Sequence, residues 1–389
     1  MVMSASSFSG FPADARILGL DIGSISVDVV LLDGLGTPLY SRYVRHHGQP
    51  DKVLCAELEA LERTHAGIAA AVTGTGADRV GRLLGACAVN EVIAQVAAAS
   101  FRYPQARSVI DIGGQDSKYI QLEPAGEGDG LRLKDFSVSS MCASGTGSFL
   151  DQQATRLGLD IETEFGEAAL RSRAPARIAG RCSVFAKSDM IHLQQKGTPV
   201  EDIVAGLCHA LARSFKANVV GVKALELPVA LVGGVAANAG VVKALRSVLH
   251  LEEDGLFVPE DFALSGAFGA ALFLLGGQGE AVPYKGLAAF REGLRQRVTM
   301  KTLVPLQPVS VSPPGCRGSS DAGPKVSAGF MPPLRPSASS LPDGAGTRGL
   351  PGRPEARIPE GGSPSSAPRE PAASPLAADD GDSIRRSLC

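Results

Sequence analysis

Two cysteine motifs in the middle of the chain carry the residue type best suited to holding a metal centre. Cys142 lies in the stretch SSMCASGTGSFL and Cys182 in the stretch IAGRCSVFAKSD, and glycine lies close to both. Apolar residues at helical spacing follow each cysteine, so we expect each thiol at the start of a helix. There the free N–H groups and the positive end of the helix dipole favour the thiolate, which is the form that binds metals.

Two thiolates leave a metal site incomplete. An iron–sulfur cluster normally takes four thiolates and a structural zinc ion takes four ligands, yet no other cysteine or histidine lies near the pair with ligand spacing. Cys55 and Cys208 lie in predicted helices and are assigned no ligand role. We therefore predict a two-fold homodimer in which each chain gives two sulfurs to one shared iron–sulfur cluster.

A second kind of chemistry is indicated by a repeated tripeptide. The segment ILGLDIGSISVDVVLL, from Ile17, recurs as SVIDIGGQDSKYIQL, from Ser108, and each reads as strand, DIG turn and strand. Such a turn leaves backbone N–H groups free to face a phosphate, and Asp21 can hold a magnesium ion or its water. One such turn is most often a plain hairpin, but the repeat indicates a duplicated unit whose two turns clamp a polyphosphate.

The second turn and a later double glycine add candidate binding groups. Gly113 and Gly114 permit close backbone approach, and Gln115, Asp116 and Lys118 bring polar groups to the same turn. In PVALVGGVAANAG, bare backbone at Gly233 and Gly234 suits a ribose or a flat ring, and Asn238 offers an amide. A plain strand-to-helix turn remains the alternative for this stretch. Glu91, near a helix start, is either a partner of the helix dipole or a residue near the nucleotide.

The elements between these motifs indicate how they are positioned. AELEALERTH carries Leu58 and Leu61 on one face, one turn beyond Leu54, so we expect an amphipathic helix packed on a sheet. The helix DFALSGAFGAALFLLGG contains small residues that permit close packing. We expect it to close the cleft without touching the chemistry.

Composition excludes several classes of protein. The 389 residues are 44% hydrophobic and carry a net charge of -2, without the basic excess of a nucleic-acid-binding protein. No run of about 18 apolar residues occurs, so no membrane-spanning helix is expected, and the N-terminus lacks the apolar core of an export signal. Seven scattered cysteines are typical of a reducing cytoplasm rather than of a disulfide framework.

Five ranges describe the predicted organisation: a flexible N-terminus at 1–15, a first half at 16–100, a second half with the cysteine motifs at 101–277, an extension at 278–304 and a disordered tail at 305–389. The tail is rich in proline, serine and glycine and contains Phe330 as its single aromatic residue. Such a segment cannot bury enough apolar area to offset the entropy of ordering it.

The order of DIG, DIGG and VGGVAAN turns resembles the superfamily of sugar kinases, actin and heat-shock chaperones, in which two ribonuclease-H-like halves close on ATP. With CASGTGSFLD and GRCSVFAKSDMI between the second and third turns, residues 16–277 resemble the ATP-dependent activators of 2-hydroxyacyl-CoA dehydratases. These are related to the ATPase subunits of benzoyl-CoA reductase. The resemblance implies an α/β fold of duplicated ribonuclease-H-like halves.

The same resemblance implies cofactors, roles and partners. Cys142 and Cys182 correspond to the ligands of one [4Fe-4S] cluster that bridges a homodimer, and each cleft takes ATP and Mg²⁺. The implied reaction is ATP hydrolysis coupled to transfer of one electron to a dehydratase or reductase component, with ferredoxin or flavodoxin as the donor. The implied catalytic residues are Asp21, Gln115 and Asp116, and the implied nucleotide-binding residues are Gly23, Ser24, Gly113, Gly114, Lys118, Gly233, Gly234 and Asn238.

One residue departs from the pattern of that family, and two other functions remain open. Many members carry a basic residue shortly after the first DIG turn, where this chain has Asp28. A small-molecule kinase of the same superfamily would need no cluster. A non-catalytic ATP-binding regulatory protein would use the two cysteines as buried residues or as a thiol switch.

Overall fold

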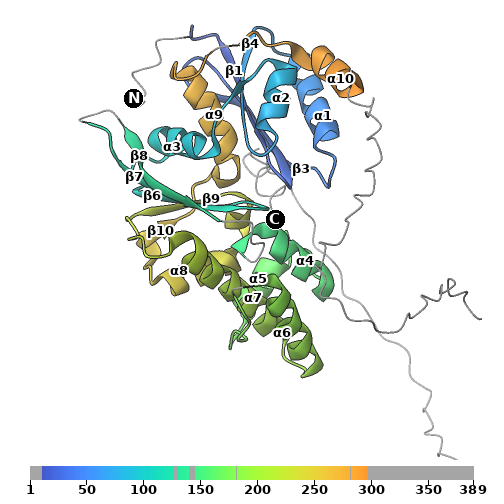
Figure 1. Cartoon of the computed structure of the whole chain (residues 1–389), viewed down its shortest axis with the longest axis vertical. Helices are drawn as coiled ribbons and strands as arrows, with labels where there is room; N and C mark the ends of the chain where they lie inside the picture. Colours follow the sequence, from blue (N-terminus) through green and yellow to red (C-terminus); the bar gives the residue numbers. More distant parts are fainter. Residues whose placement is uncertain (1–10, 127–129, 140–144, 181, 281, 297–389) are drawn as a thin grey trace, which may run out of the picture. The chain divides into compact units, whose positions relative to one another are not determined.

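Two five-stranded sheets form the framework of the part of the chain that this computed structural model describes, residues 11–126, 130–139, 145–180, 182–280 and 282–296 (Figure 1). The first sheet has the strand order β3-β2-β1-β4-β5 and the second the order β10-β9-β6-β7-β8. The strands of the first sheet are β1 (Arg16–Ile22), β2 (Ser26–Leu32), β3 (Pro38–Arg45), β4 (Ile68–Thr73) and β5 (Cys87–Ala88). Those of the second are β6 (Ser108–Ile112), β7 (Ser117–Pro124), β8 (Leu131–Val138), β9 (Val229–Val232) and β10 (Leu256–Phe257).

The two sheets are built alike. In each, three consecutive strands pair antiparallel, and two later strands add in parallel beside the first of them. Strands β1 and β6 end inside the two DIG tripeptides, at Ile22 and Ile112. The predicted duplication is therefore a structural repeat, and the α/β fold class of two ribonuclease-H-like halves is confirmed.

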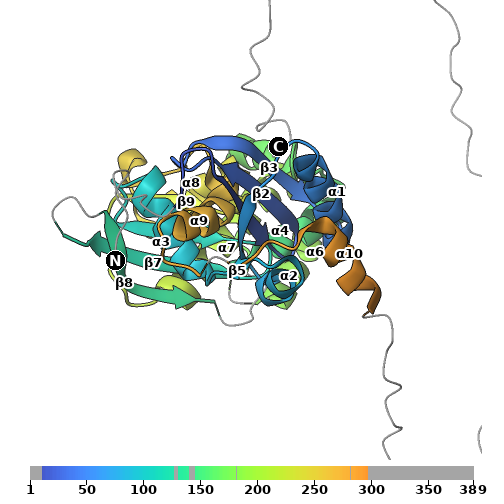
Figure 2. The same ribbon diagram turned by 90° about the horizontal axis from the view of Figure 1, so that it is seen from above.

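Three helices cover the outer face of the first sheet: α1 (Pro50–Glu62), α2 (Ala77–Leu84) and α10 (Gly286–Gln296), which lie together in both views (Figures 1 and 2). The leucines predicted to form the apolar face of α1, which include Leu54 and Leu58, are buried in the same core as strand residues Leu20 and Val29. Fully burying one leucine contributes about 1.5–3 kcal/mol, so this periodicity is sufficient to dock the helix.

Helices on the far face of the second sheet follow the cysteine motifs. They are α4 (Gly147–Leu157), α5 (Phe165–Arg171), α6 (Ser183–Gln195), α7 (Val200–Phe215) and α8 (Ala239–Leu249). Cys208 on α7 is fully buried in this core, as its position on an apolar stripe predicted. Cys55 is half-buried on α1.

Helices α3 (Glu91–Arg102) and α9 (Ser265–Leu275) form the layer between the two sheets (Figure 1). A Cβ atom on Gly269 would overlap the backbone carbonyl of Ala94, so the small residues of α9 do permit the predicted close packing. The hydroxyl groups of Ser265 and Tyr103 lie 2.6 Å apart and join the end of α3 to α9. Although α9 belongs to the predicted range 101–277, it packs on the first sheet, where Gly19 of β1 makes room for it.

Within the described ranges, no helix combines the length and the apolar character that crossing a membrane requires. Cys142 and the predicted tail at 305–389 lie outside the described residues.

Candidate functional site

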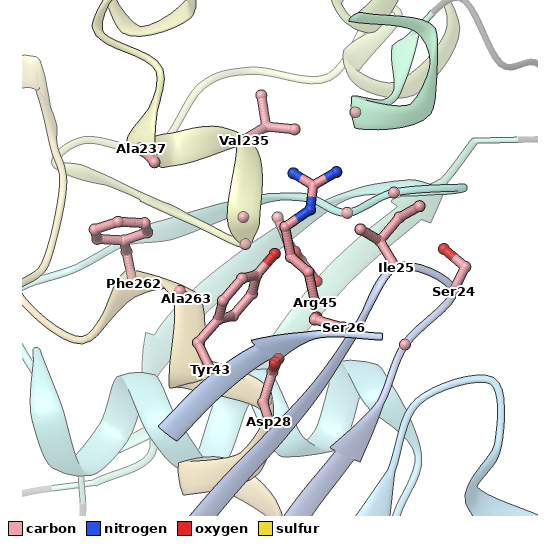
Figure 3. A pocket seen from close by; sticks show the side chains of 18 of the residues that line it. Ser24, Ile25, Ser26, Asp28, Tyr43, Arg45, Val235, Ala237, Phe262 and Ala263 are labelled. Atoms are coloured by element: carbon pink, nitrogen blue, oxygen red, sulfur yellow. The ribbon is translucent and has the colours of Figure 1, made fainter. Parts of the chain in front are cut away.

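One pocket lies where the two DIG turns and the double-glycine turn meet (Figure 3). Elements of both sheets line it, and so does the N-terminal part of α4. Apart from the two cysteines, every predicted site residue lines this pocket: Asp21, Gly23, Ser24, Gly113, Gly114, Gln115, Asp116, Lys118, Gly233, Gly234 and Asn238. The sequence motifs that lie far apart along the chain therefore share one site.

The two DIG turns close in the same way and face each other. The N–H of Gly23 donates to the carbonyl of Ser26 at 3.0 Å, and the N–H of Gly113 donates to the carbonyl of Asp116 at 3.0 Å. A Cβ atom on Gly114 would lie 2.8 Å from the hydroxyl of Ser24 and would overlap the side chain of Ile25, so the bare backbone of Gly114 lets the two turns approach. This is the facing arrangement that the repeat predicted for a polyphosphate clamp.

Glycines hold the two repeated aspartates in equivalent settings. Gly74 follows β4 and lies against the carboxylate of Asp21, and Gly233 follows β9 and lies against that of Asp111. Both glycines have positive φ, 86° for Gly74 and 85° for Gly233. Burial, together with the negative charges of Glu91 and Asp111, raises the pKa of Asp21 to about 7. Burial likewise raises the pKa of Asp111.

Lys118 is the buried cation of the second half. Its ammonium group lies 2.6 Å from Glu91, 2.9 Å from Asp116 and 3.7 Å from Asp111. Burial alone would lower the pKa of Lys118, but these carboxylates raise it above its ordinary value, so the side chain stays charged. Both readings of Glu91 have support, because Glu91 is the first residue of α3 and it also lines the pocket and pairs with Lys118.

The double-glycine turn forms another wall of the pocket. Gly234 lies so close to Tyr43 that a Cβ atom would be 2.9 Å from the phenol oxygen. Asn238 lines the pocket, and its side-chain oxygen accepts from the N–H of Val241 at 3.1 Å, which caps the start of α8. The turn is thus both a pocket wall and a strand-to-helix turn, so the two interpretations that the sequence left open are compatible.

Several residues that line the pocket were not predicted, because they lie outside the sequence motifs. Tyr43 and Arg45 point into the pocket from β3, opposite Val235 and Ala237 (Figure 3). Their spacing of two residues could have indicated that both side chains lie on one face of a strand. Gly266 of α9 lies against the carboxylate of Asp21, so the expectation that this helix would not touch the site is wrong. Close packing between α9 and β1 brings it there.

Two sets of contacts join α4 to the clamp. The N–H groups of Gly147 and Ser148 donate to the carbonyls of Gly113 and Gly114, at 2.9 and 3.0 Å. From the other side of the pocket, Arg45 pairs with Asp151 of α4 at 2.8 Å. Helix α4 is therefore attached both to the second DIG turn and to a strand of the first sheet.

Cys182 is the N-cap residue of α6, and its partly exposed thiol is free. The prediction of a helix start is thus confirmed for this cysteine. The helix that follows Cys142 begins only at Gly147, with Thr146 as its N-cap, so Cys142 itself does not cap it. Among the residues that the structure describes, no group of three or more His, Cys, Asp or Glu side chains is placed to hold a metal ion.

Comparison with known proteins gives a consistent result. The 2-hydroxyisocaproyl-CoA dehydratase activator of Clostridioides difficile is 35% identical over 185 residues, which are 48% of this chain and 66% of that protein. The activator of lactoyl-CoA dehydratase of Anaerotignum propionicum is 32% identical over 260 residues, which are 66% of this chain and 96% of that protein.

A solved structure agrees with this. The activator of the 2-hydroxyisocaproyl-CoA dehydratase from Clostridium difficile with bound ADPNP matches with a TM-score of 0.58 and 31% identity, over 74% of this chain and 99% of that one. The family model of the BadF/BadG/BcrA/BcrD ATPases matches residues 18–273, which contain both DIG turns, both cysteine motifs and the double glycine. The chain belongs to the BadF/BadG/BcrA/BcrD ATPase family.

Proposed function

We propose that this chain is an ATPase that activates a 2-hydroxyacyl-CoA dehydratase, or a related CoA-ester reductase, by coupling ATP hydrolysis to the transfer of one electron. The observation that carries the proposal is the convergence of both DIG turns and the double-glycine turn on one pocket, with α4 attached to it. The relatives that are named as dehydratase activators support the choice of partner.

In the proposed complex the nucleotide lies between the two halves. Gly23, Ser24, Gly113, Gly114 and the side chain of Lys118 contact the phosphates. The N–H groups of Gly23 and Gly113 close their own turns, so these glycines contribute close backbone approach, and Lys118 contributes a buried cation. Asp21 holds the Mg²⁺ ion or one of its waters, and Gln115 and Asp116 orient the attacking water. The adenosine lies against Gly233, Gly234 and Asn238, where bare backbone permits close approach. ADPNP in the solved relative supports a triphosphate as the ligand.

Helix α4 provides a route from hydrolysis to the cysteine region. Because the N–H groups of Gly147 and Ser148 bind the carbonyls of the second DIG turn, a shift of that turn on loss of the γ-phosphate moves the start of α4. The segment that contains Cys142 leads directly into this helix. Nucleotide state would thereby change the setting of one proposed ligand.

The proposed cluster is one [4Fe-4S] centre held by Cys142 and Cys182 of two chains, and it supplies one-electron redox chemistry when bound. Cys182 suits a thiolate ligand, because the N-terminus of α6 offers its free N–H groups. Cationic side chains lie close by: Arg177 and Arg213 line a hollow that includes Gly180, two residues before Cys182. An anionic centre would be stabilised by both features.

The face of α6 beside Cys182 supports the homodimer. Val184 and Phe185 are each 66% exposed and Ile191 is 40% exposed. Large apolar side chains that gather beside a thiol are typical of a surface that another chain covers. A second copy related by two-fold symmetry would cover this face and bring two further thiolates.

Anaerobic purification followed by iron and sulfide analysis tests this proposal. We expect about four irons per dimer, ATP hydrolysis, and loss of the iron in a Cys182→Ser variant with nucleotide binding retained. Ferredoxin or flavodoxin should reduce the protein. Iron-free protein that phosphorylates a small acceptor would instead support the kinase alternative. Iron-free protein that binds ATP without hydrolysing it would support a regulatory protein.

A further inference from the structure

A row of polar side chains crosses the first sheet at the pocket. Strand register places Tyr43 of β3 beside Asp28 of β2, Asp28 beside Asp21 of β1, and Asp21 beside Thr73 of β4. All of them line the pocket, and Figure 3 shows Asp28 below Tyr43 and Ser26. Neighbouring positions of this kind are about 4.5–5.5 Å apart at Cα, so the oxygen atoms of Asp28 and Thr73 lie on either side of Asp21, within reach of one hydrated ion centred on Asp21.

Two oxygens of this row are buried without a partner. Asp28 is 6% exposed and Thr73 is 0% exposed. Among the described residues, neither the Oδ1 atom of Asp28 nor the Oγ1 atom of Thr73 has a hydrogen-bond partner. A buried polar atom that stays unpaired costs about 1–3 kcal/mol, and a carboxylate costs more. Asp28 and Thr73 flank Asp21 on either side, so one ligand at Asp21 would satisfy both atoms.

The second half has a lysine at the position that corresponds to Asp28. Asp111 is the counterpart of Asp21, and strand register pairs it with Lys118, as Asp21 is paired with Asp28. Asp28 thus has the position of the buried lysine, but with the opposite charge. Two carboxylates directly opposite each other repel, and the charge of Asp21 contributes to raising the pKa of Asp28 after the larger effect of burial.

Among the described residues, a hydrogen bond from Ser26 to Asp28 and the charge of Lys118 near Asp21 offset this reversal only in part, because burial and the other carboxylates still raise the pKa of both aspartates. Arg45, the cation nearest in sequence that lines the pocket, is engaged with Asp151 and Glu162 at 2.8 and 3.3 Å. Lys118 is already paired with the carboxylates of Glu91, Asp111 and Asp116. A triphosphate would therefore meet an acidic first half, which a bound cation would neutralise.

We propose that the first half binds a divalent metal ion between the carboxylates of Asp21 and Asp28 and the hydroxyl of Thr73, before any nucleotide arrives. The ion takes the place that the ammonium group of Lys118 has in the second half. Oxygen ligands select a hard cation, and a site with two carboxylates and one hydroxyl suits Mg²⁺, which keeps several of its waters. The protein thereby supplies its own metal ion to the phosphates.

Calorimetric titration of the full-length, nucleotide-free and metal-free chain with MgCl₂ tests the site directly. We expect one Mg²⁺ ion per chain. Asp28→Asn keeps the shape of the side chain but removes a charged ligand, so the affinity should fall at least about tenfold. Thr73→Val, which removes only the hydroxyl, should weaken binding by a smaller factor. Glu167→Gln is the matched control: it removes an exposed carboxylate that lines the same pocket outside the row, and its Mg²⁺ affinity should match that of the unchanged chain.

A charge-reversed variant gives a second, independent measurement. Asp28→Lys should bind no Mg²⁺ in the absence of nucleotide, yet it should bind ADPNP at a lower Mg²⁺ concentration than the unchanged chain, because its lysine replaces the ion. Retained ADPNP binding shows that the variant is folded. An unchanged chain that takes up no Mg²⁺, or an Asp28→Asn variant with unaltered affinity, would overturn the proposal. Neither result depends on iron content or ATP hydrolysis, so the activator function is tested separately.

Discussion

Lys118 sets the charge balance of the second half, because it is the buried cation among three carboxylates. We expect Lys118→Met to cost at most about 3–5 kcal/mol of unfolding free energy, because it leaves the buried carboxylate of Asp111 uncompensated, whereas Glu91 and Asp116 are partly exposed. ADPNP affinity should fall as well. Urea denaturation and calorimetry measure the two effects. The control is Lys134→Met, which removes the exposed pair with Glu226, and its midpoint should stay close to that of the unchanged chain. Equal denaturation midpoints for the two variants would contradict the role of Lys118 in balancing the buried charge.

Gly233 combines an unusual backbone with a close neighbour. Its φ of 85° and ψ of 163° lie in a region that is essentially restricted to glycine, and a Cβ atom would lie 2.6 Å from the carboxylate of Asp111. We expect Gly233→Ala to cost about 1–3 kcal/mol for the backbone alone, with a further cost from displacing Asp111 and a loss of nucleotide affinity.

Gly197 supplies the comparison for that variant. Its φ is 73°, and nothing lies within 4 Å of the position that a Cβ atom would occupy. Gly197→Ala should therefore cost about 1–2 kcal/mol from the left-handed backbone and leave nucleotide binding unchanged. Thermal denaturation with and without ADPNP separates the two contributions. If both variants bind ADPNP equally well, Gly233 has no special place in the site.

At the scale of elements, α4 is the helix that contacts the pocket from two sides. Arg45 joins it to β3, and the second DIG turn holds its first residues. We expect ADPNP to protect the amides of α4 from hydrogen exchange, and we expect Arg45→Ala to remove much of that protection while the DIG turns stay protected. Arg42→Ala is the control, because Arg42 lies on the same strand, is 56% exposed at its side chain and pairs with Glu57 away from α4. Loss of protection in both variants would argue against a specific link.

Local sequence patterns predicted some helices and turns correctly but could not predict contacts between distant elements. Both DIG turns and the leucine face of α1 follow from neighbours in sequence, so their patterns were sufficient. The apolar spacing after Cys142 predicted the helix but not its first residue, which is Gly147, and Cys142 itself lies outside the described residues. The contact of α9 with Asp21 had no local signal, since it depends on the packing of α9 against β1.

At the scale of the whole molecule, the proposed homodimer is the feature with the sharpest test. We expect Phe185→Ser to shift the protein toward a monomer and to reduce its iron content, because the substitution removes the largest exposed apolar side chain beside Cys182. ADPNP binding should persist, since Phe185 does not line the pocket. Light scattering after anaerobic size exclusion, with iron analysis, measures this.

Leu35 provides the matched control for that interface. It is 64% exposed, nearly the same as Phe185, but it lies in the turn between β2 and β3. Leu35→Ser should remain dimeric and keep its iron. A Phe185→Ser protein that is still dimeric and fully loaded with iron would show that the apolar face of α6 is not the contact between copies.

The sequence by itself determined the duplicated strands, the glycine turns and the types of residue available for chemistry, because these depend on periodicity and on backbone freedom over a few residues. Only the tertiary structure decided which side chains meet. Strand register set Asp21 between Asp28 and Thr73, and packing of α3 onto the second sheet brought Glu91 to Lys118. Such contacts join residues far apart in the chain, so they follow from the closing of the layers around a core and not from any local pattern.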